Sequence, residues 1–323
     1  PVSLTACKNT CHRDTAATCT YRRPLANIEN QKLHNCMKKI SYYSILFVIL
    51  IIDPLFGQSS KQVTTTIGPS NGTLIILGGG DLSESLIKRF IQIGGGLDAP
   101  MVIIPTADGQ DNYDDNFGEA GMLKKIGATN VKVLHTTDRE IANTESFVEP
   151  LIDAKVVWFS GGRQWRLIDA YKNTLTEKML WKVLENGGVI GGSSAGATIQ
   201  GSFLVRGDTR NNQIMMGDHQ EGFGFLKNTA IDQHVLARNR HFDMIEILTQ
   251  RPEVLGIGID ESTGIIVNGN QFEVIGESYV VVYDGSFWSR EGSDLKKIPE
   301  NTALFYFLRA GDKYDLLNRR VIQ

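Results

Sequence analysis

Short apolar runs alternate with longer segments of helical periodicity from residue 73 onward. The apolar runs read as strands over residues 73–77, 101–105, 131–134, 155–159 and 189–190. The segments between them read as helices over residues 83–93, 117–126, 163–171 and 176–185. Strands that are apolar throughout are typical of a parallel sheet covered by helices on both faces. The pattern therefore predicts an α/β fold with a doubly wound, mostly parallel sheet.

The pattern changes in the C-terminal third, where strands follow one another closely. These strands are expected at residues 257–260, 264–267, 272–275 and 279–283. Asn268-Gly269-Asn270 is a hairpin signal between two of them, so β-hairpin strands should complete the fold. We see no repeat, low-complexity tract or linker that would divide residues 59–323, and we expect a single domain there.

Glycines mark three strand ends in the predicted sheet. They are Gly78–Gly80, Gly161–Gly162 and Gly191–Gly192. In open α/β sheets, ligands bind at the carboxyl ends of strands, and glycine there lets a backbone approach a ligand closely. A dinucleotide site would need the spacing G-x-G-x-x-G after the first strand, but GGGDLSES stands there instead. The sequence therefore predicts no nucleotide cofactor.

Residues 37–58 read MKKISYYSILFVILIIDPLFGQ and differ from the rest of the chain. Met37 and two lysines precede an apolar run too short to span a bilayer, and the small residue Gly57 follows it. This order predicts a secretory signal peptide at 37–58, with a buried helix or a membrane anchor as the alternatives. From the signal peptide we expect a secreted or periplasmic protein without a stable membrane anchor. Residues 1–36, which precede Met37, resemble non-coding upstream sequence that has been translated with the gene.

Cysteines and charge narrow the chemistry of the mature chain. All four cysteines (Cys7, Cys11, Cys19 and Cys36) precede Met37, which leaves no disulfide framework, zinc–cysteine cluster or cysteine nucleophile after it. We accordingly predict no metal site. Residues 1–58 carry seven Lys/Arg and three Asp/Glu, so the remaining chain has a net charge of -7 where the full chain has -3. An acidic chain argues against a nucleic-acid partner.

A nucleophile elbow is predicted at Gly192-Ser193-Ser194-Ala195-Gly196, which matches G-x-S-x-G. It follows an apolar strand and precedes a helix-compatible run, which is the context that the motif requires. A sharp strand-to-helix turn crowds the backbone, so the neighbours of the nucleophile must be small. The register favours Ser194 over Ser193 as the nucleophile. The alternative is a small-residue turn without chemistry.

A serine nucleophile needs a general base and a group that orients it. Four histidines follow residue 58: His135, His219, His234 and His241. His234 has the most polar setting, after Asp232 and Gln233 and before Arg238 and Arg240. Asp260 and Glu261 end a strand and are candidates for the orienting acid. The chain order would be Ser, His, acid, whereas α/β-hydrolases run Ser, acid, His, so the order disfavours an esterase or lipase of that type.

Four segments together resemble the cyanophycinase branch of the S51 serine peptidases. They are GGSSAGA, FSGGRQ, DQHVLARNR and GIGIDESTG, and the resemblance extends roughly over residues 72–283. It implies a fold similar to class I glutamine amidotransferases, with Ser194 as nucleophile, His234 as base and Glu261, in preference to Asp260, as the orienting acid. It implies oxyanion donors at Ala195 and at Gly161 or Gly162, and association as a homodimer. The implied substrate-pocket residues are Gln164, Asp232, Gln233, Arg238 and Arg240.

The resemblance also implies a substrate. Members of this branch cleave cyanophycin, a polyaspartate that carries arginine on each side-chain carboxyl, and release β-Asp-Arg dipeptides. Two positions depart from the family's pattern, since Arg163 replaces the usual aspartate and Asp243 the usual third arginine. Two other readings stay open on the sequence: a dipeptidase acting on short aspartyl or isoaspartyl peptides, and a non-catalytic binding protein of the same fold.

Overall fold

The computed structural model describes residues 66–81, 83–292 and 303–323. All of them belong to one compact unit, Val63–Gln323. The predicted upstream segment 1–36 and signal peptide 37–58 lie outside the described residues. Among the helices that are described, none is long and apolar enough to cross a membrane.

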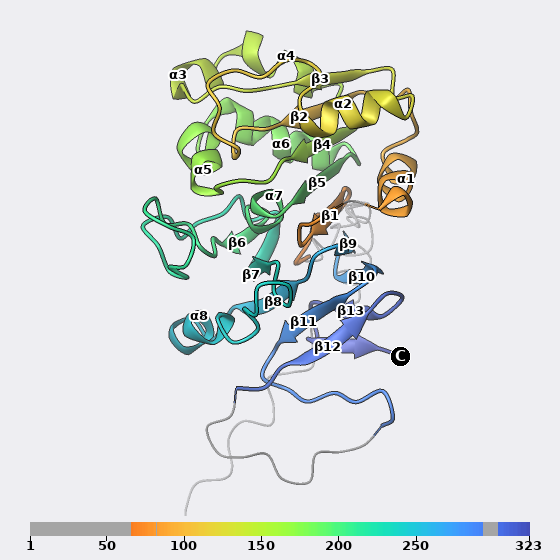
Figure 1. Ribbon diagram of the computed structural model, residues 1–323, viewed down its shortest axis with the longest axis vertical. Helices are drawn as coiled ribbons and strands as arrows, with labels where there is room; N and C mark the ends of the chain where they lie inside the picture. Colours follow the sequence, from red (N-terminus) through yellow and green to blue (C-terminus); the bar gives the residue numbers. More distant parts are fainter. Residues whose placement is uncertain (1–65, 82, 293–302) are drawn as a thin grey trace, which may run out of the picture. The chain divides into compact units, whose positions relative to one another are not determined.

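The larger of two sheets has nine strands, drawn from both the N-terminal and the C-terminal parts of this unit (Figure 1). Its parallel part has the order β1, β5, β4, β2, β3, with bounds Thr73–Leu77, Val189–Ser193, Val156–Phe159, Met101–Ile104 and Val131–Val133. On the other side of β1 follow four antiparallel strands, β9 (Thr263–Asn268), β10 (Gln271–Gly276), β13 (Lys313–Asp315) and β14 (Arg320–Ile322). The predicted hairpin at Asn268-Gly269-Asn270 joins β9 to β10.

A second sheet of five strands has the order β12, β11, β8, β7, β6. Its parallel strands are β6 (Gly201–Phe203), β7 (Leu226–Gln233) and β8 (Leu255–Ile259). Its antiparallel strands are β11 (Tyr279–Tyr283) and β12 (Tyr306–Arg309). The sequence pattern predicted a C-terminal set of β-hairpin strands but did not say which sheet each of them joins. The C-terminal strands divide between two sheets because β8 and β9 pair with different neighbours across the turn at Glu261.

The two sheets share one core, which contains Leu74 and Ile76 from β1 together with Ile257 and Ile259 from β8. The helices α4 (Glu145–Ile152), α5 (Trp165–Tyr171) and α6 (Leu175–Glu185) contribute to the same core. The opposite face of the first sheet packs against α1 (Glu84–Ile93) and α2 (Gly118–Lys125). The outer face of the second sheet packs against α8 (Met244–Gln250). The prediction of an α/β fold is confirmed.

Most of the predicted elements occur with shifted ends. Helix α1 begins at Glu84, and Ser83 is its N-cap, because the Ser83 side chain accepts a hydrogen bond from the Leu86 N–H. The pattern missed the short helix α3 (Arg139–Ala142), and it missed α4, which contains Pro150, a residue that normally breaks helices. It also missed α8 and the strands β6, β7, β12, β13 and β14.

Candidate active site

Ser194 lies on a strained turn between β5 and the short helix α7 (Ala195–Thr198). Its φ of 55° and ψ of -110° are uncommon for a residue with a side chain and cost about 1–3 kcal/mol. The surrounding structure holds the strain, since the Ser194 N–H donates to the Leu77 carbonyl at 3.0 Å. Ser193 ends β5 and is buried. The predicted strand–turn–helix context of the elbow is present.

Small residues make this turn sterically feasible. A Cβ on Gly192 would lie 2.3 Å from the Gly196 carbonyl oxygen, and one on Gly196 would lie 2.1 Å from the Phe159 carbonyl oxygen. Both distances are far below a normal contact, so only glycine fits. Helix α7 can therefore begin immediately after the turn at Ser194, where it packs against β5 and also contacts β1, β4 and β7.

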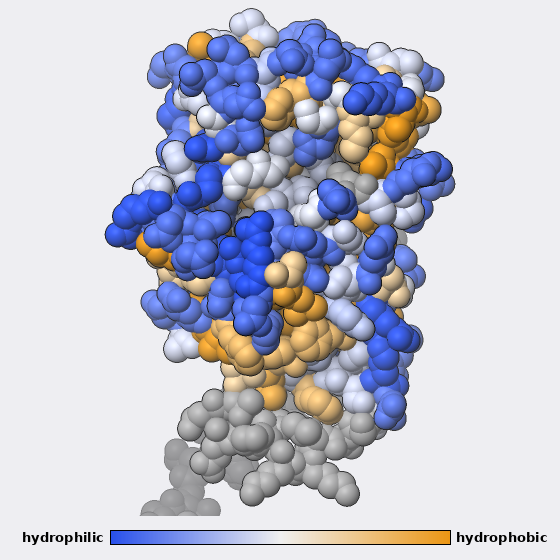
Figure 2. All heavy atoms as spheres, viewed as in Figure 1, coloured by the Kyte–Doolittle hydropathy of each residue, from blue (hydrophilic) through white to orange (hydrophobic). Residues whose placement is uncertain are grey.

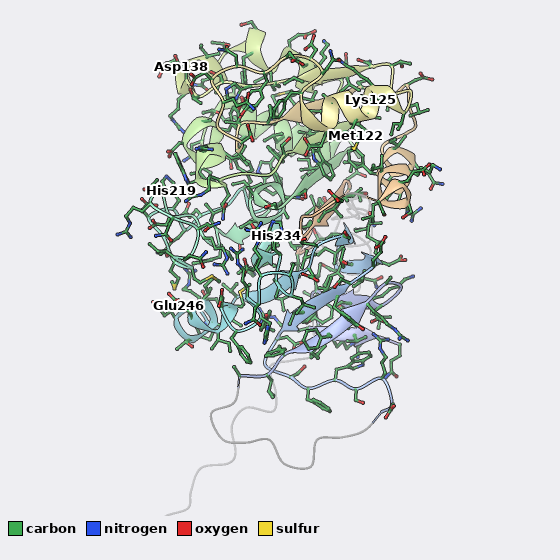
Figure 3. All side chains as sticks on the ribbon, viewed as in Figure 1. Met122, Lys125, Asp138, His219, His234 and Glu246 are labelled. Carbon is green, nitrogen blue, oxygen red and sulfur yellow. The ribbon has the colours of Figure 1, made fainter. Side chains whose placement is uncertain are left out.

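His234 contacts Ser194 from the end of β7. The Ser194 Oγ lies 2.9 Å from His234 Nε2, and His234 Nδ1 lies 2.6 Å from Glu261 Oε1. A carboxylate only accepts, so Nδ1 carries the proton and Nε2 is left to accept from the serine hydroxyl. The labelled His234 lies near the junction of the two sheets (Figure 3). The structure thus joins Ser194 of the first sheet to His234 and Glu261 of the second.

The surroundings of His234 favour its neutral form. Burial lowers the pKa of the imidazole below its ordinary value, and the hydrogen bond to Glu261 opposes this. The positive charges of Arg238 and Arg240 lower the pKa further. The imidazole of His234 is therefore neutral near neutral pH, and its unprotonated Nε2 faces the Ser194 hydroxyl.

The neighbouring carboxylate, Asp260, has a different task from Glu261. It accepts hydrogen bonds from the backbone N–H groups of Leu236 and Ala237 at 3.0 and 2.8 Å, and from the Ser278 hydroxyl at 2.6 Å. These bonds fix the turn that follows His234. Asp260 thus anchors this turn, whereas Glu261 is the carboxylate that contacts His234.

The other three histidines are occupied elsewhere. His135 contacts the Thr106 hydroxyl at 2.9 Å, and His219 contacts the carboxylates of Asp169 and Asp218. His219 lies well away from His234 (Figure 3). His241 packs against the ring of Phe242. Within the described part of the chain, only His234 contacts the elbow serine.

Glycine-marked strand ends surround these three side chains, as the sequence predicts. A Cβ on Gly79 would lie 2.1 Å from His234 Cε1, and one on Gly80 would lie 2.8 Å from Glu261 Cβ. A Cβ on Gly161 would lie 3.5 Å from Ser194 Cβ and 4.0 Å from Ser194 Oγ. The backbone of Gly161 thus borders the serine, beside Ala195, the first residue of α7, whose N–H has no partner within the helix.

Three of the residues expected to line a substrate pocket are buried and bonded within the chain. Gln164 is 1% exposed and donates to the carbonyls of Val205 and Arg206 at 2.6 and 2.9 Å. Asp232 is also 1% exposed, and Gln233 accepts from Arg240 at 3.0 Å. Their polar groups are thus engaged by other residues of the chain.

Arg238 and Arg240 provide the positive charge near His234. Arg238 is exposed and has no ion pair in the residues that the structure describes. Arg240 is 5% exposed and uses Nη1 for the Gln233 carbonyl and side-chain oxygens. The positive charges of both guanidinium groups lower the pKa of His234.

Asp243, a departure from the family's pattern, pairs with an arginine that sequence reasoning missed. Arg206 is fully buried and contacts Asp232 Oδ1 at 2.8 Å and Asp243 Oδ2 at 2.6 Å. Its φ of 56° lies in the left-handed region, as does the φ of 55° of His234. No motif pointed to Arg206, because its importance comes from burial between two carboxylates far apart in the sequence. Arg163, the other departure, donates to the Asp208 carbonyl at 2.5 Å.

Comparisons with known proteins point to a peptidase family. Residues 74–275 match the sequence model of peptidase family S51. A cyanophycinase from Geminocystis herdmanii (strain PCC 6308) is 29% identical over 260 residues, which cover 75% of this chain and 93% of that protein. A cyanophycinase from Synechococcus elongatus is 26% identical over 322 residues, which cover 93% of this chain and 96% of that protein.

A solved structure supports the fold independently. The crystal structure of a peptidase from an acI-B1 Actinobacterium superposes with a TM-score of 0.57 at 24% identity, covering 77% of this chain and 98% of that one. The family match extends over more than half of the chain and includes Ser194, His234 and Glu261. The chain therefore belongs to peptidase family S51 and is a serine-type peptidase.

Proposed function

We propose that this peptidase is cyanophycinase-like and works through an acyl-enzyme on Ser194. The hydrogen-bonded series Ser194, His234, Glu261 carries the proposal. His234 Nε2 takes the hydroxyl proton while Oγ bonds to the substrate's carbonyl carbon, and the same proton then goes to the leaving amine. In the second step His234 takes a proton from water, the water oxygen attacks the acyl carbon, and the proton returns to the Ser194 oxygen as the ester bond breaks. Glu261 keeps the proton on Nδ1 and stabilises the imidazolium that forms.

The proposed oxyanion donors are backbone N–H groups next to the serine. Ala195 follows the nucleophile at the start of α7, and Gly161 borders Ser194 from the end of β4. Gly162 has a φ of 134°, a conformation that glycine adopts easily and that lets the loop turn there. Donors fixed by the backbone need no reorganisation when negative charge develops on the carbonyl oxygen.

The proposed substrate is cyanophycin, on the strength of the relatives with that activity in their names. Release of intact β-Asp-Arg requires cleavage of the amide between successive backbone aspartates, so the acyl group on Ser194 is an aspartyl α-carbonyl. Arg238 and Arg240 suit the carboxylates that such a polymer carries on its arginines and at its end. Asp243 stands where a third arginine is usual, so this chain has one positive charge fewer near the site. The Asp243 carboxylate instead pairs with Arg206.

The test is hydrolysis by residues 59–323, purified beside Ser194→Ala. The protein is incubated with insoluble cyanophycin, a soluble dimer of β-Asp-Arg units and isoaspartyl dipeptides, and the products are identified by mass spectrometry. We expect β-Asp-Arg from the polymer and the dimer, and a loss of rate on the order of 10⁴- to 10⁶-fold in Ser194→Ala. Cleavage confined to isoaspartyl dipeptides would instead establish the dipeptidase alternative.

We also propose that residues 37–58 direct export, on their sequence pattern alone. The full chain is expressed in a Gram-negative host, and the periplasm, medium and membranes are analysed with N-terminal sequencing. We expect a shortened protein that begins close to residue 58 in the periplasm or medium. Retention of an unprocessed chain in the cytoplasm or membrane would reject this proposal without affecting the catalytic one.

A further inference from the structure

Four aromatic residues form a continuous row on the outer face of the second sheet, three of them exposed and one, Phe305, partly buried between them. Phe242, Phe305, Phe307 and Tyr279, here called the aromatic strip, follow one another with ring centroids 5.7, 5.7 and 6.0 Å apart. Phe242 is 60% exposed, Tyr279 46% and Phe307 39%. Figure 2 shows hydrophobic surface gathered over β11 and β12, directly below a strongly hydrophilic area. Contiguous exposed apolar surface of this kind marks an interaction site.

The aromatic strip adjoins the active site at both ends. At one end, Phe242 follows Arg240 by two residues in the segment that leads away from His234. At the other end, the Tyr279 carbonyl accepts from the Asp260 N–H at 3.2 Å, and Asp260 precedes Glu261. Both ends of the strip thus lie next to segments that carry residues of the active site.

The geometry of the rings fits planar cations. Neighbouring rings meet edge to face, at interplanar angles of 77°, 90° and 77°, and the rings of Phe242, Phe307 and Tyr279 are accessible to a ligand. Guanidinium groups stack on the faces of such rings. The same chain uses this contact internally, because Arg290 lies 5.0 Å from the Trp288 ring centroid and Arg166 lies 5.4 Å from that of Trp165.

Exposed arginines flank the aromatic strip. Arg238 lies near Phe242 in sequence, and Arg309 is the register partner of Tyr279 on β12. Neither guanidinium has an ion pair in the described part of the chain. Exposed aromatic rings can stack on the guanidinium groups of a ligand, and the arginines beside them can bind its carboxylate groups. An arginine side branch with a free α-carboxylate has both.

We propose that the aromatic strip is a docking surface for the arginine branches of a polymeric substrate outside the scissile unit. The proposal rests on the proposed function, and it adds a second contact that holds the enzyme on insoluble polymer. Such a contact should lower the polymer concentration needed for half-maximal rate and leave turnover of short substrates unchanged.

The test removes two rings and leaves the catalytic residues in place. Phe242→Ser/Phe307→Ser is compared with Ile152→Ser, a control at a residue of α4 that is 57% exposed. In a Ser194→Ala background, binding to insoluble cyanophycin is measured by co-sedimentation. We expect the apparent Kd to rise about two- to fivefold per ring, or roughly tenfold in the double variant, and to stay unchanged in the control. With Ser194 intact, turnover of the soluble β-Asp-Arg dimer should stay within about twofold of wild type.

Several outcomes would overturn the proposal. Unchanged polymer binding in the double variant is one, and equal wild-type binding to polyaspartate without arginine is another. A dimer that dissociates in the double variant, seen by light scattering, would assign the strip to a second copy of the chain. If the enzyme cleaves no short substrate, the proposed function fails, but co-sedimentation still measures docking directly. Thermal melting confirms that the variants are folded.

Discussion

At the scale of single residues, burial and charged neighbours together set the charge state of two side chains, His234 and Arg206. His234 is buried beside two arginines, and its only carboxylate partner in the described residues is Glu261. Arg206 is buried between two carboxylates. In both cases the side chain's chemistry is set by neighbours that are distant in sequence, so substitutions of those neighbours give the sharpest tests.

The pH dependence of kcat/KM tests the environment of His234. The base must be unprotonated and burial lowers the pKa of His234 below its ordinary value, so activity should rise with pH and the midpoint of this acid limb should lie below pH 6.5. Arg238→Gln removes a charge that disfavours the imidazolium, so the pKa of His234 should rise and the acid limb should move to higher pH. Lys125→Gln, on the distant helix α2, should not move it. An acid limb that is identical in Arg238→Gln would show that this charge does not act on the base.

The buried Arg206 predicts a large loss of stability on truncation. Arg206→Met leaves the Asp232 carboxylate buried without its partner and should lower the free energy of unfolding by about 3–5 kcal/mol. Arg251→Met removes an exposed pair with Glu253 and should cost less than about 1 kcal/mol. Urea denaturation measures both variants. Equal effects would mean that Asp232 finds another partner.

At the scale of elements, the elbow is a steric device whose glycines have different tasks. A methyl group on Gly196 would overlap the Phe159 carbonyl, whereas one on Gly161 would make an ordinary contact with Ser194 Cβ. Gly196→Ala should therefore destabilise the fold strongly. Gly161→Ala should fold normally but lose activity, because the methyl group occupies space beside the nucleophile. Melting temperature and hydrolysis rate, measured on both variants, distinguish these effects. A fully active Gly161→Ala would exclude this loop from the oxyanion site.

The sequence predicts the elements around the site better than it predicts their assembly. Apolar runs bounded by glycine identify β1, β4 and β5, and the elbow motif identifies Ser194, because these signals are local. Two features depend on tertiary context instead. Pairing across the turn at Glu261 decides which sheet β8 and β9 join, and α4 forms around Pro150 because Val148 and Leu151 are buried in the shared core.

At the scale of the whole molecule, the catalytic series bridges two sheets. Ser194 follows β5 of the first sheet, while His234 and Glu261 follow β7 and β8 of the second. The hydrogen bonds between them survive only if the sheets keep their relative position. The shared core that contains Leu74, Ile76, Ile257 and Ile259 supplies that constraint.

This arrangement predicts that the two sheets unfold together. Ile257→Ala opens a cavity between the sheets and should lower the free energy of unfolding by about 2–5 kcal/mol. Ile103→Ala, equally buried but on the far face of the first sheet, should cost a similar amount. In both variants, activity and far-UV circular dichroism should be lost in one coincident transition, because neither sheet can bury its inner face alone. If activity disappeared well before the circular dichroism signal in Ile257→Ala alone, the sheets would separate before they unfold. The site would then depend on a weaker contact than the shared core implies.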